Sequence, residues 1–197
     1  MNGTLTILGI PGSLRRASYN RAALIAAQGL LPAGTRLDIF DLEGLPMFNQ
    51  DKEAQPAPRV VAFKDAIRGA DAILFATPEY NYSMSGVLKN AIDCASRPYG
   101  DSAWEGKPVA VMGASVSMFG TMRAQNHLRQ TFVSLDMHPV NEPEVMIDNA
   151  GKAFDKQGLL VDEASRKLIR QLLENLAHWA RQLEESSGVQ PAALQDG

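Results

Sequence analysis

A short polar stretch after the first apolar run carries the residues best suited to bind an anion. The run at 5–10 leads into residues 12–20, which are rich in Gly, Ser, Arg and Asn, and then into a helix-like segment rich in Ala and Leu. A tight turn between a strand and a helix presents free backbone N–H groups and the positive end of the helix dipole. Arg15 can add a forked charged contact, and the hydroxyls of Ser13 and Ser18 can donate further hydrogen bonds. These groups predict a phosphate site; the alternative is that Ser18 only caps the helix and the arginines are solvated.

The spacing of the glycines narrows the class of phosphate ligand. Gly9 and Gly12 do not form the Gly-x-Gly-x-x-Gly pattern of dinucleotide-binding folds, and no Gly-Lys-Ser or Gly-Lys-Thr indicates a nucleotide triphosphatase. Asp41 follows the second apolar run, where a dinucleotide fold places its ribose-binding acid, but without the glycine fingerprint that match is weak. A loop rich in polar side chains suits the exposed terminal phosphate of a mononucleotide. We therefore expect flavin mononucleotide (FMN).

The loop at 77–86 follows another apolar run and combines proline, acid, tyrosine and asparagine. Pro78 stiffens this turn by holding the preceding residue extended. Backbone groups of the loop could face the edge of a flavin while Tyr80 supplies a flat surface. The alternative is an Asn- and Ser-rich turn that ends in a helix cap at Ser83 or Ser85. Its position opposite a phosphate loop favours ligand binding.

A third loop, at 113–120, consists mostly of small residues, which let a backbone approach a planar ligand closely. Ser115 stands after an apolar run, as a hydrolase nucleophile does, but Ser117 occupies the place of the second glycine in the Gly-x-Ser-x-Gly pattern. The hydrolase interpretation is therefore disfavoured. The three histidines lie far apart and show no ligand spacing, so no metal site is predicted.

Two kinds of apolar pattern alternate along the chain. Nearly unbroken or alternating apolar runs indicate strands at 4–10, 35–40, 70–77, 107–114 and within 138–147. Helical spacing fills the intervals, most clearly in the last helix, which carries Ile169, Leu172 and Leu176 on one side. Five strands and five helices in alternation predict an α/β fold: a flavodoxin-like, doubly wound five-stranded parallel sheet of order 2-1-3-4-5.

Ligands of such sheets bind outside the carboxyl ends of the strands, beside the point where the strand order reverses. The loops at 12–20, 77–86 and 113–120 all follow strands at this point. We therefore expect the three loops to form a single site.

Size and composition restrict the class of protein further. The 197 residues predict one domain, assigned to 1–185, followed by a small, polar and flexible tail at 186–197. A net charge of −3 provides no basic face for nucleic acid. No apolar run is long enough to span a bilayer, and the first residues lack the regions of a signal peptide, so no membrane partner is expected. The single cysteine, Cys94, lies on an apolar helix stripe, which predicts core packing and suits a cytoplasmic location.

Taken together, the loops resemble those of the NAD(P)H-dependent FMN reductase family, in the branch of soluble quinone and chromate reductases. The likeness runs from about Thr4 to the last helix. The matching motifs are Gly12-Ser13-Leu14-Arg15 with Ser18 and Asn20, Leu45-Pro46-Met47-Phe48-Asn49-Gln50-Asp51, Pro78-Glu79-Tyr80-Asn81, Ser85-Gly86-Val87-Leu88-Lys89-Asn90-Ala91-Ile92-Asp93 and Gly113-Ala114-Ser115. One departure is Ser117, where the family often has glycine.

The resemblance implies tightly but noncovalently bound FMN. The residues implied for its phosphate are Ser13, Arg15, Ser18 and Asn20, and those implied for its ribityl chain and ring are Pro78, Glu79, Tyr80, Asn81 and Ser115. It further implies NADPH or NADH as the reductant. A quinone or a similar small molecule, such as FMN, chromate or an azo compound, would be the electron acceptor.

Because a flavin carries the chemistry, no residue is predicted to be catalytic. We expect the nicotinamide and the acceptor to use one pocket in turn, which gives ping-pong kinetics. One subunit offers little to wall a flavin at the rim of a thin domain, so a homodimer or homotetramer is expected. The contact would involve the helix after Ser85, with Lys89, Asn90 and Asp93 able to pair across a two-fold axis. The segment 123–129 is either a solvated face or an interface.

Two other classes of protein remain as alternatives. A flavodoxin-like electron carrier would bind FMN but react with neither nicotinamide, and the modest net charge and the two arginines of the first loop disfavour it. A binding module that uses FMN only as a redox signal would change its affinity for a partner with the state of the flavin.

Overall fold

Strand β1 (Leu5–Pro11) is an internal strand of the sheet, and all of its residues are buried. In the computed structural model, which describes residues 3–187, β1 pairs with β2 (Thr35–Ile39) and β3 (Ala72–Ala76). β4 (Pro108–Ala114) pairs with β3, and the short β5 (His138–Pro139) pairs with β4. All of these pairs are parallel, and the order 2-1-3-4-5 confirms the predicted flavodoxin-like topology.

The segment 138–147, in which the fifth strand was predicted, holds two short strands. β5 pairs with the beginning of β4, and β6 (Val145–Ile147) pairs with its end, from Met112 to Ala114. The Val140 N–H still donates to the Val109 carbonyl of β4 at 2.8 Å, whereas Pro143 has no N–H to donate to a sheet, and pairing resumes at Val145. The predicted fifth strand is therefore present as β5, and β6 is a sixth strand in addition to the five predicted.

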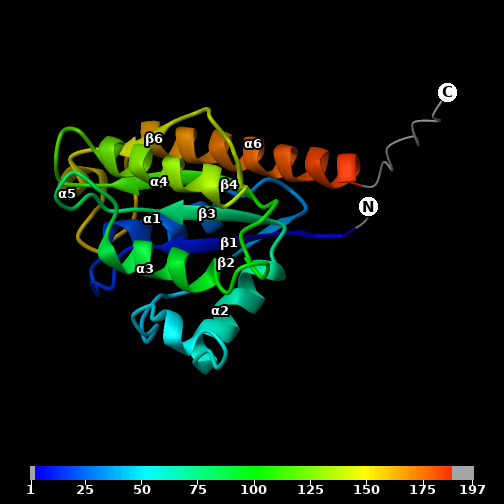
Figure 1. Ribbon diagram of the computed structural model, residues 1–197. Coiled ribbons are helices and arrows are strands. Elements are labelled where there is room, and N and C mark those ends of the chain that lie inside the picture. Colours follow the sequence, from blue (N-terminus) through cyan, green and yellow to red (C-terminus); the bar gives the residue numbers. More distant parts are fainter. Residues whose placement is uncertain (1–2, 188–197) are drawn as a thin grey trace.

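The helices cover both faces of the sheet (Figure 1). Their bounds are α1 (Tyr19–Gln28), α2 (Pro58–Arg68), α3 (Gly86–Ala95), α4 (Met122–Ser134), α5 (Ala150–Ala153) and α6 (Glu163–Ser187), with a 3-10 turn η1 (Gln50–Lys52). Side chains of α1 and α6 pack with one set of strand residues, and those of α2, α3 and α4 pack with the other. Ile7 and Leu8 of β1 point into opposite layers, as expected from the two-residue period of a strand.

Two glycines let the loops at the carboxyl ends approach one another. A Cβ on Gly12 would lie 2.9 Å from Cδ of Pro78, and a Cβ on Gly113 would lie 2.4 Å from the carbonyl oxygen of Thr77, which directly follows β3. Both distances are shorter than a carbon atom allows. The loops after β1, β3 and β4 therefore lie side by side.

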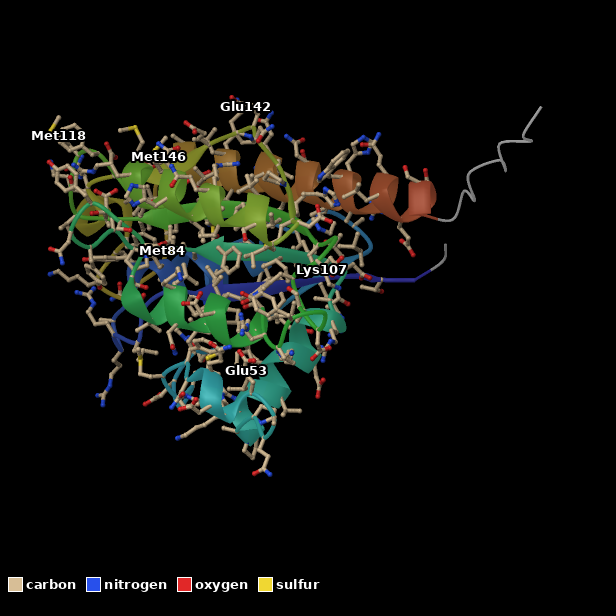
Figure 2. All side chains as sticks on the ribbon, in the orientation of Figure 1. Glu53, Met84, Lys107, Met118, Glu142 and Met146 are labelled. Atoms are coloured by element: carbon tan, nitrogen blue, oxygen red, sulfur yellow. The ribbon has the colours of Figure 1, made fainter. Side chains whose placement is uncertain are left out.

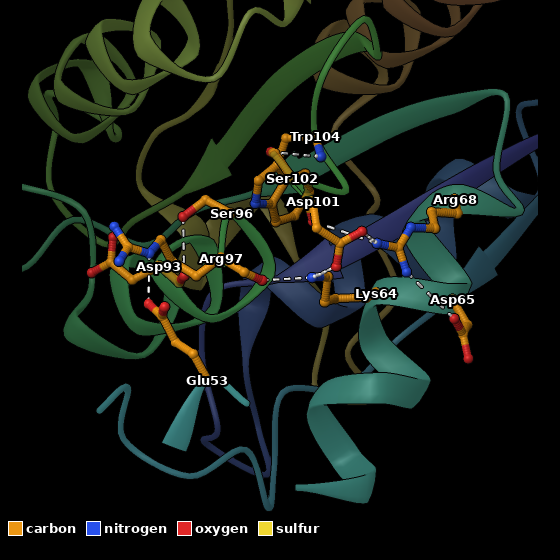
Figure 3. Close-up of polar contacts among 10 residues, drawn as sticks. All are labelled: Glu53, Lys64, Asp65, Arg68, Asp93, Ser96, Arg97, Asp101, Ser102 and Trp104. Atoms are coloured by element: carbon orange, nitrogen blue, oxygen red, sulfur yellow. Dashed lines mark hydrogen bonds and ion pairs between the residues drawn. The ribbon is translucent and has the colours of Figure 1, made fainter. Parts of the chain in front are cut away.

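A polar network fixes the segment between α3 and β4 (Figure 3). The ammonium group of Lys64, which is buried in α2, donates to the Arg97 carbonyl at 2.5 Å and to the Asp101 carboxylate at 2.6 Å. Contact with Lys64 lowers the pKa of Asp101. The Arg97 guanidinium in turn donates to the Glu53 carboxylate at 2.6 Å. These bonds join α2, the chain before it and the end of α3.

The predicted tail begins inside the last helix, because α6 continues through Ser186 and Ser187. The rest of that predicted tail, 188–197, lies outside the described residues. Within residues 3–187, no helix combines the length and the apolar composition needed to cross a bilayer.

Candidate cofactor site

The carboxyl ends of the strands and the loops that follow them gather at one edge of the sheet, on the left of Figure 1. Met84 and Met118, from the loops after β3 and β4, lie toward this edge, whereas Lys107, just before β4, lies toward the opposite one (Figure 2). The three predicted loops therefore come together where the sequence placed them.

The two serines of the first loop accept backbone hydrogen bonds. Ser18 is the N-cap of α1 and accepts from the Arg21 N–H at 3.2 Å, while Ser13 accepts from the Arg15 N–H at 3.3 Å. An accepting hydroxyl still has a proton to donate. The first N–H groups of α1 have no partner within the helix. Helix capping and phosphate binding by Ser18 are therefore compatible.

Arg15 lies beside this helix end on an exposed part of the loop. Its guanidinium donates to the Ala17 carbonyl and stands 5.3 Å from the centre of the Tyr19 ring. A guanidinium has five N–H donors, so most of them stay available to an anion. Arg21, in contrast, is bound at 3.1 Å and 3.2 Å to Asp41, which raises the pKa of Arg21. Asp41, the position considered for a ribose contact, is thus occupied by an ion pair.

Asn20 joins two of the loops through its side chain. Its Nδ2 donates to the Ala114 carbonyl at 3.0 Å, and its Oδ1 accepts from the Ala114 N–H at 2.8 Å. The residue is 3% exposed. The amide therefore fixes the start of α1 against the end of β4, and its backbone N–H is the group that can face a phosphate. Sequence reasoning did not find this contact, because the two residues lie far apart in the chain.

The carboxylate of Glu79 stabilises a helix in another loop. It accepts from the backbone N–H groups of Arg123 at 3.0 Å and Ala124 at 3.2 Å, and it forms an ion pair with the Arg123 guanidinium. The residue before α4, Thr121, makes no side-chain cap, so Glu79 supplies the negative group at this helix end. Its side chain is 6% exposed. Only the backbone of Glu79 is therefore left to face a ligand.

Residues 80–83 form a tight turn with unusual backbone angles. Tyr80 and Ser83 exchange two hydrogen bonds of 3.0 Å, and Asn81 and Tyr82 have φ of +50° and +67°. Such angles define a type I′ turn, which costs energy at residues other than glycine and is common where a loop serves a ligand. The turn leaves Tyr80 52% exposed. Tyr80 is therefore accessible to a ligand, as its predicted role requires.

Ser85 caps a helix, as the alternative interpretation of this loop expects, and its hydroxyl also contacts the first loop. As the N-cap of α3 it accepts from the Leu88 N–H at 3.1 Å, and its hydroxyl donates to the Gly12 carbonyl at 2.6 Å. The cap therefore also binds the phosphate loop. Nearby, Nδ1 of His127 and Oγ of Ser83 are 2.9 Å apart, so helix α4 supports the same turn.

Two hydroxyls shape the third loop. Ser115 accepts from the Ser117 N–H at 3.1 Å, and Ser117 accepts from the Phe119 N–H at 3.2 Å. Ser117, where the family often has glycine, thus stabilises a turn through its hydroxyl. Gly120 has φ of +56°, and a Cβ there would lie 2.9 Å from Cβ of Met146. The loop holds Val116, Met118 and Phe119 outward with more than half of each side chain exposed.

Not all of the α3 residues that were predicted to pair across a two-fold axis are free to do so. Asn90 is 8% exposed and uses its amide to bind the Phe48 N–H and the Pro46 carbonyl, so the role proposed for it is wrong. Lys89 and Asp93 form an ion pair with each other along α3, at 2.7 Å. Cys94 is buried, as predicted, and burial raises the pKa of its thiol.

The assembled site combines groups that suit a flavin mononucleotide. The start of α1 and Arg15 offer donors to a phosphate, while Tyr80 and the turn at 80–83 offer a flat surface and backbone groups to a ring. Residues 5–152 match the model of a family described as NADPH-dependent FMN reductase. The chain belongs to this family. Membership confirms the predicted class of enzyme, an NAD(P)H-dependent oxidoreductase with FMN and NADPH or NADH as its cofactors.

Relatives within the family are similar over nearly their whole length. An NAD(P)H-dependent FMN reductase of Pseudomonas aeruginosa is 55% identical over 93% of this chain and 99% of its own. A 2-hydroxy-1,4-benzoquinone reductase of a Burkholderia species is 43% identical over 90% of this chain and 97% of its own. Among solved structures, the flavoenzyme NAD(P)H:(acceptor) oxidoreductase FerB of Paracoccus denitrificans has a TM-score of 0.83 at 33% identity, over 90% of this chain and 98% of its own.

Proposed function

We propose that this FMN reductase family member takes hydride from NADPH or NADH and passes it, through bound FMN, to a quinone or a similar small acceptor. The observation that carries the proposal is that the capped start of α1, Arg15 and the exposed Tyr80 meet at one edge of the sheet, where donors for a phosphate and a flat surface for a ring are needed. A relative named quinone reductase from Pseudomonas putida, at 41% identity, and the 2-hydroxy-1,4-benzoquinone reductase of Burkholderia, at 43%, support the class of acceptor.

The residues of the three loops would hold the cofactor without chemistry of their own. Ser13, Arg15, Ser18 and the backbone N–H of Asn20 would bind the phosphate. The ribityl chain and ring would be lined by Pro78, Glu79, Tyr80, Asn81 and Ser115, with Glu79 contributing backbone only. FMN, when bound, supplies the acceptance and release of a hydride. The chain's own part is to bind, to orient and to leave one face of the ring open.

A single pocket for both substrates implies a ping-pong sequence. The nicotinamide would leave before the acceptor enters, because both need the same open face of the ring. The exposed apolar side chains of Val116, Met118 and Phe119 lie on the adjoining loop and suit a planar, weakly polar acceptor such as a quinone.

We also propose that a second copy of the chain covers this edge, as a homodimer or within a homotetramer. The support is the group of exposed apolar side chains on one loop, which a monomer would leave in water. A cytoplasmic location is proposed as well, because a single buried thiol suits a reducing compartment.

The decisive test of the proposed reaction separates its two halves. Purified protein loaded with FMN is mixed with NADPH or NADH under anaerobic conditions, and the flavin absorbance is recorded. We expect rapid bleaching, followed by full recovery when a benzoquinone is added, and parallel double-reciprocal plots at varied quinone concentration. A flavin that neither nicotinamide bleaches would support the electron carrier instead.

A further inference from the structure

A cavity of about 440 Å³ lies beside the phosphate loop, on the flank of α1. Its walls are the loop at 15–18, the first turns of α1 and the turn at 155–158 that precedes α6. The volume falls within the range of small-ligand pockets. Arg15 and Ser18 belong both to its wall and to the predicted FMN phosphate site, so a ligand in this cavity would lie next to the flavin.

Four cationic side chains from two separate segments line this cavity: Arg15, Arg16 and Arg21 from the first loop and α1, and Lys156 from the later turn. The carboxylate of Asp41 neutralises Arg21. Among the described residues of the wall, Asp155 is the one acid, and its carboxylate accepts hydrogen bonds from the backbone N–H groups of Gln157 at 2.9 Å and Leu159 at 2.8 Å. The cavity therefore has an excess of positive charge.

Arg16 and Lys156 have no partner in the part of the chain that the structure describes. Both side chains are exposed, and neither forms a hydrogen bond, an ion pair or a ring contact within residues 3–187. Like charges brought to one cavity repel each other, so an anion between them would be bound favourably.

The turn that carries Lys156 is held in place rather than free. Phe154 packs on Tyr19 of α1 with ring centres 5.2 Å apart and pairs with Leu160 across the turn. Gly158 closes the turn with φ of +83°, and its N–H donates to the Asp155 carbonyl at 3.0 Å. The turn therefore holds Lys156 in the wall of the cavity that Arg16 also lines.

We propose that this cavity binds the 2′-phosphate of NADPH, through Arg16 and Lys156, and so selects NADPH over NADH. A phosphomonoester carries close to two negative charges near pH 7 and three acceptor oxygens, which suits an arginine and a lysine together. NADH has no such group. Ala22 and Ile25 add an apolar wall on which the adenine can lie. The inference rests on the proposed function, because it assigns a binding site to the 2′-phosphate of NADPH, the reductant of the proposed reaction.

The test compares binding and kinetics in Arg16→Ala, Lys156→Ala and the double variant. Arg181→Ala on α6, outside the cavity, is the matched control for charge, since Arg181 is exposed and has no partner within residues 3–187. With FMN present at saturation, calorimetry measures the affinity for adenosine 2′-monophosphate and for adenosine, which lacks the phosphate. Steady-state assays then give KM and kcat for NADPH and for NADH.

Each single substitution is expected to weaken the binding of adenosine 2′-monophosphate about tenfold and to raise the KM for NADPH by a similar factor. The KM for NADH, both kcat values and the affinity for FMN should stay unchanged, as should every value for the control. Unchanged binding of adenosine 2′-monophosphate in the double variant would overturn the inference. A fall in FMN affinity instead would also overturn it, because the cavity would then hold the flavin's own phosphate.

Failure of the proposed function has a different signature. A protein whose flavin neither nicotinamide reduces would refute the reaction, yet the calorimetric comparison would still show whether the cavity binds a phosphomonoester.

Discussion

At the level of single residues, several polar side chains at the site hold the loops in place, a role that their sequence context does not indicate. Side-chain hydrogen bonds to the backbone are formed by Ser18, Ser85 and Asn20. Arg15 makes one such bond and lies at the exposed rim. The motif predicted which residues gather here, but not which of them are held by the protein itself and which are left for a ligand.

Arg15→Ala tests the assignment of the free donors. The change removes a charge-assisted contact to the phosphate and should weaken FMN binding by about 1.5–3 kcal/mol, or roughly ten- to a hundredfold. Arg16→Ala, one residue along, should leave the affinity for FMN nearly unchanged. Titration of FMN into both variants measures this, and equal losses in the two would contradict the assignment.

Asn20→Ala tests the amide that joins α1 to β4. The substitution leaves both the N–H and the carbonyl of Ala114 buried without their partner, so the free energy of unfolding should fall by roughly 2–4 kcal/mol. Gln28→Ala is the matched control, because that amide on the same helix makes one bond to a strand carbonyl from an exposed position. Gln28→Ala should lower the free energy of unfolding by no more than about 1 kcal/mol. Similar denaturant midpoints for the two variants would argue against the special role of Asn20.

At the scale of elements, apolar runs predicted the strands because buried parallel strands need apolar residues on both faces. The chain between β5 and β6 contains Pro143, and Pro139 and Pro143 blurred the sequence pattern without showing where pairing resumes. The cap of α4 by Glu79 was not predictable, because its acid comes from a loop 44 residues away. Short-range sequence patterns predict helices and strands, whereas contacts between loops that lie far apart in the sequence can be identified only from the three-dimensional fold.

Glu79→Ala should loosen α4 and the turn at 80–83 together. It removes the acceptor of two helix N–H groups and the partner of Arg123, and should lower the free energy of unfolding by about 1–3 kcal/mol. Glu163→Ala, which removes a largely exposed acid from the first turn of α6, should cost less than about 0.5 kcal/mol. Chemical denaturation followed by circular dichroism compares them, and a Glu79 variant as stable as the control would disprove the cap.

At the scale of the whole molecule, the sheet brings the three loops to one edge and leaves that edge lined with exposed apolar side chains. The chain should therefore associate, at least as a dimer, with the loops after β3 and β4 near the contact. Multi-angle light scattering at micromolar concentration measures the mass. A monomer with full reductase activity would contradict the shared pocket.

We propose that the loops after β1, β3 and β4 together form one FMN site. This arrangement is tested by titrating FMN into flavin-free protein in a calorimeter. We expect saturable binding of one FMN per chain, weakened in Arg15→Ala and unchanged in Arg181→Ala. No heat at saturating FMN, or equal binding in all three proteins, would contradict it.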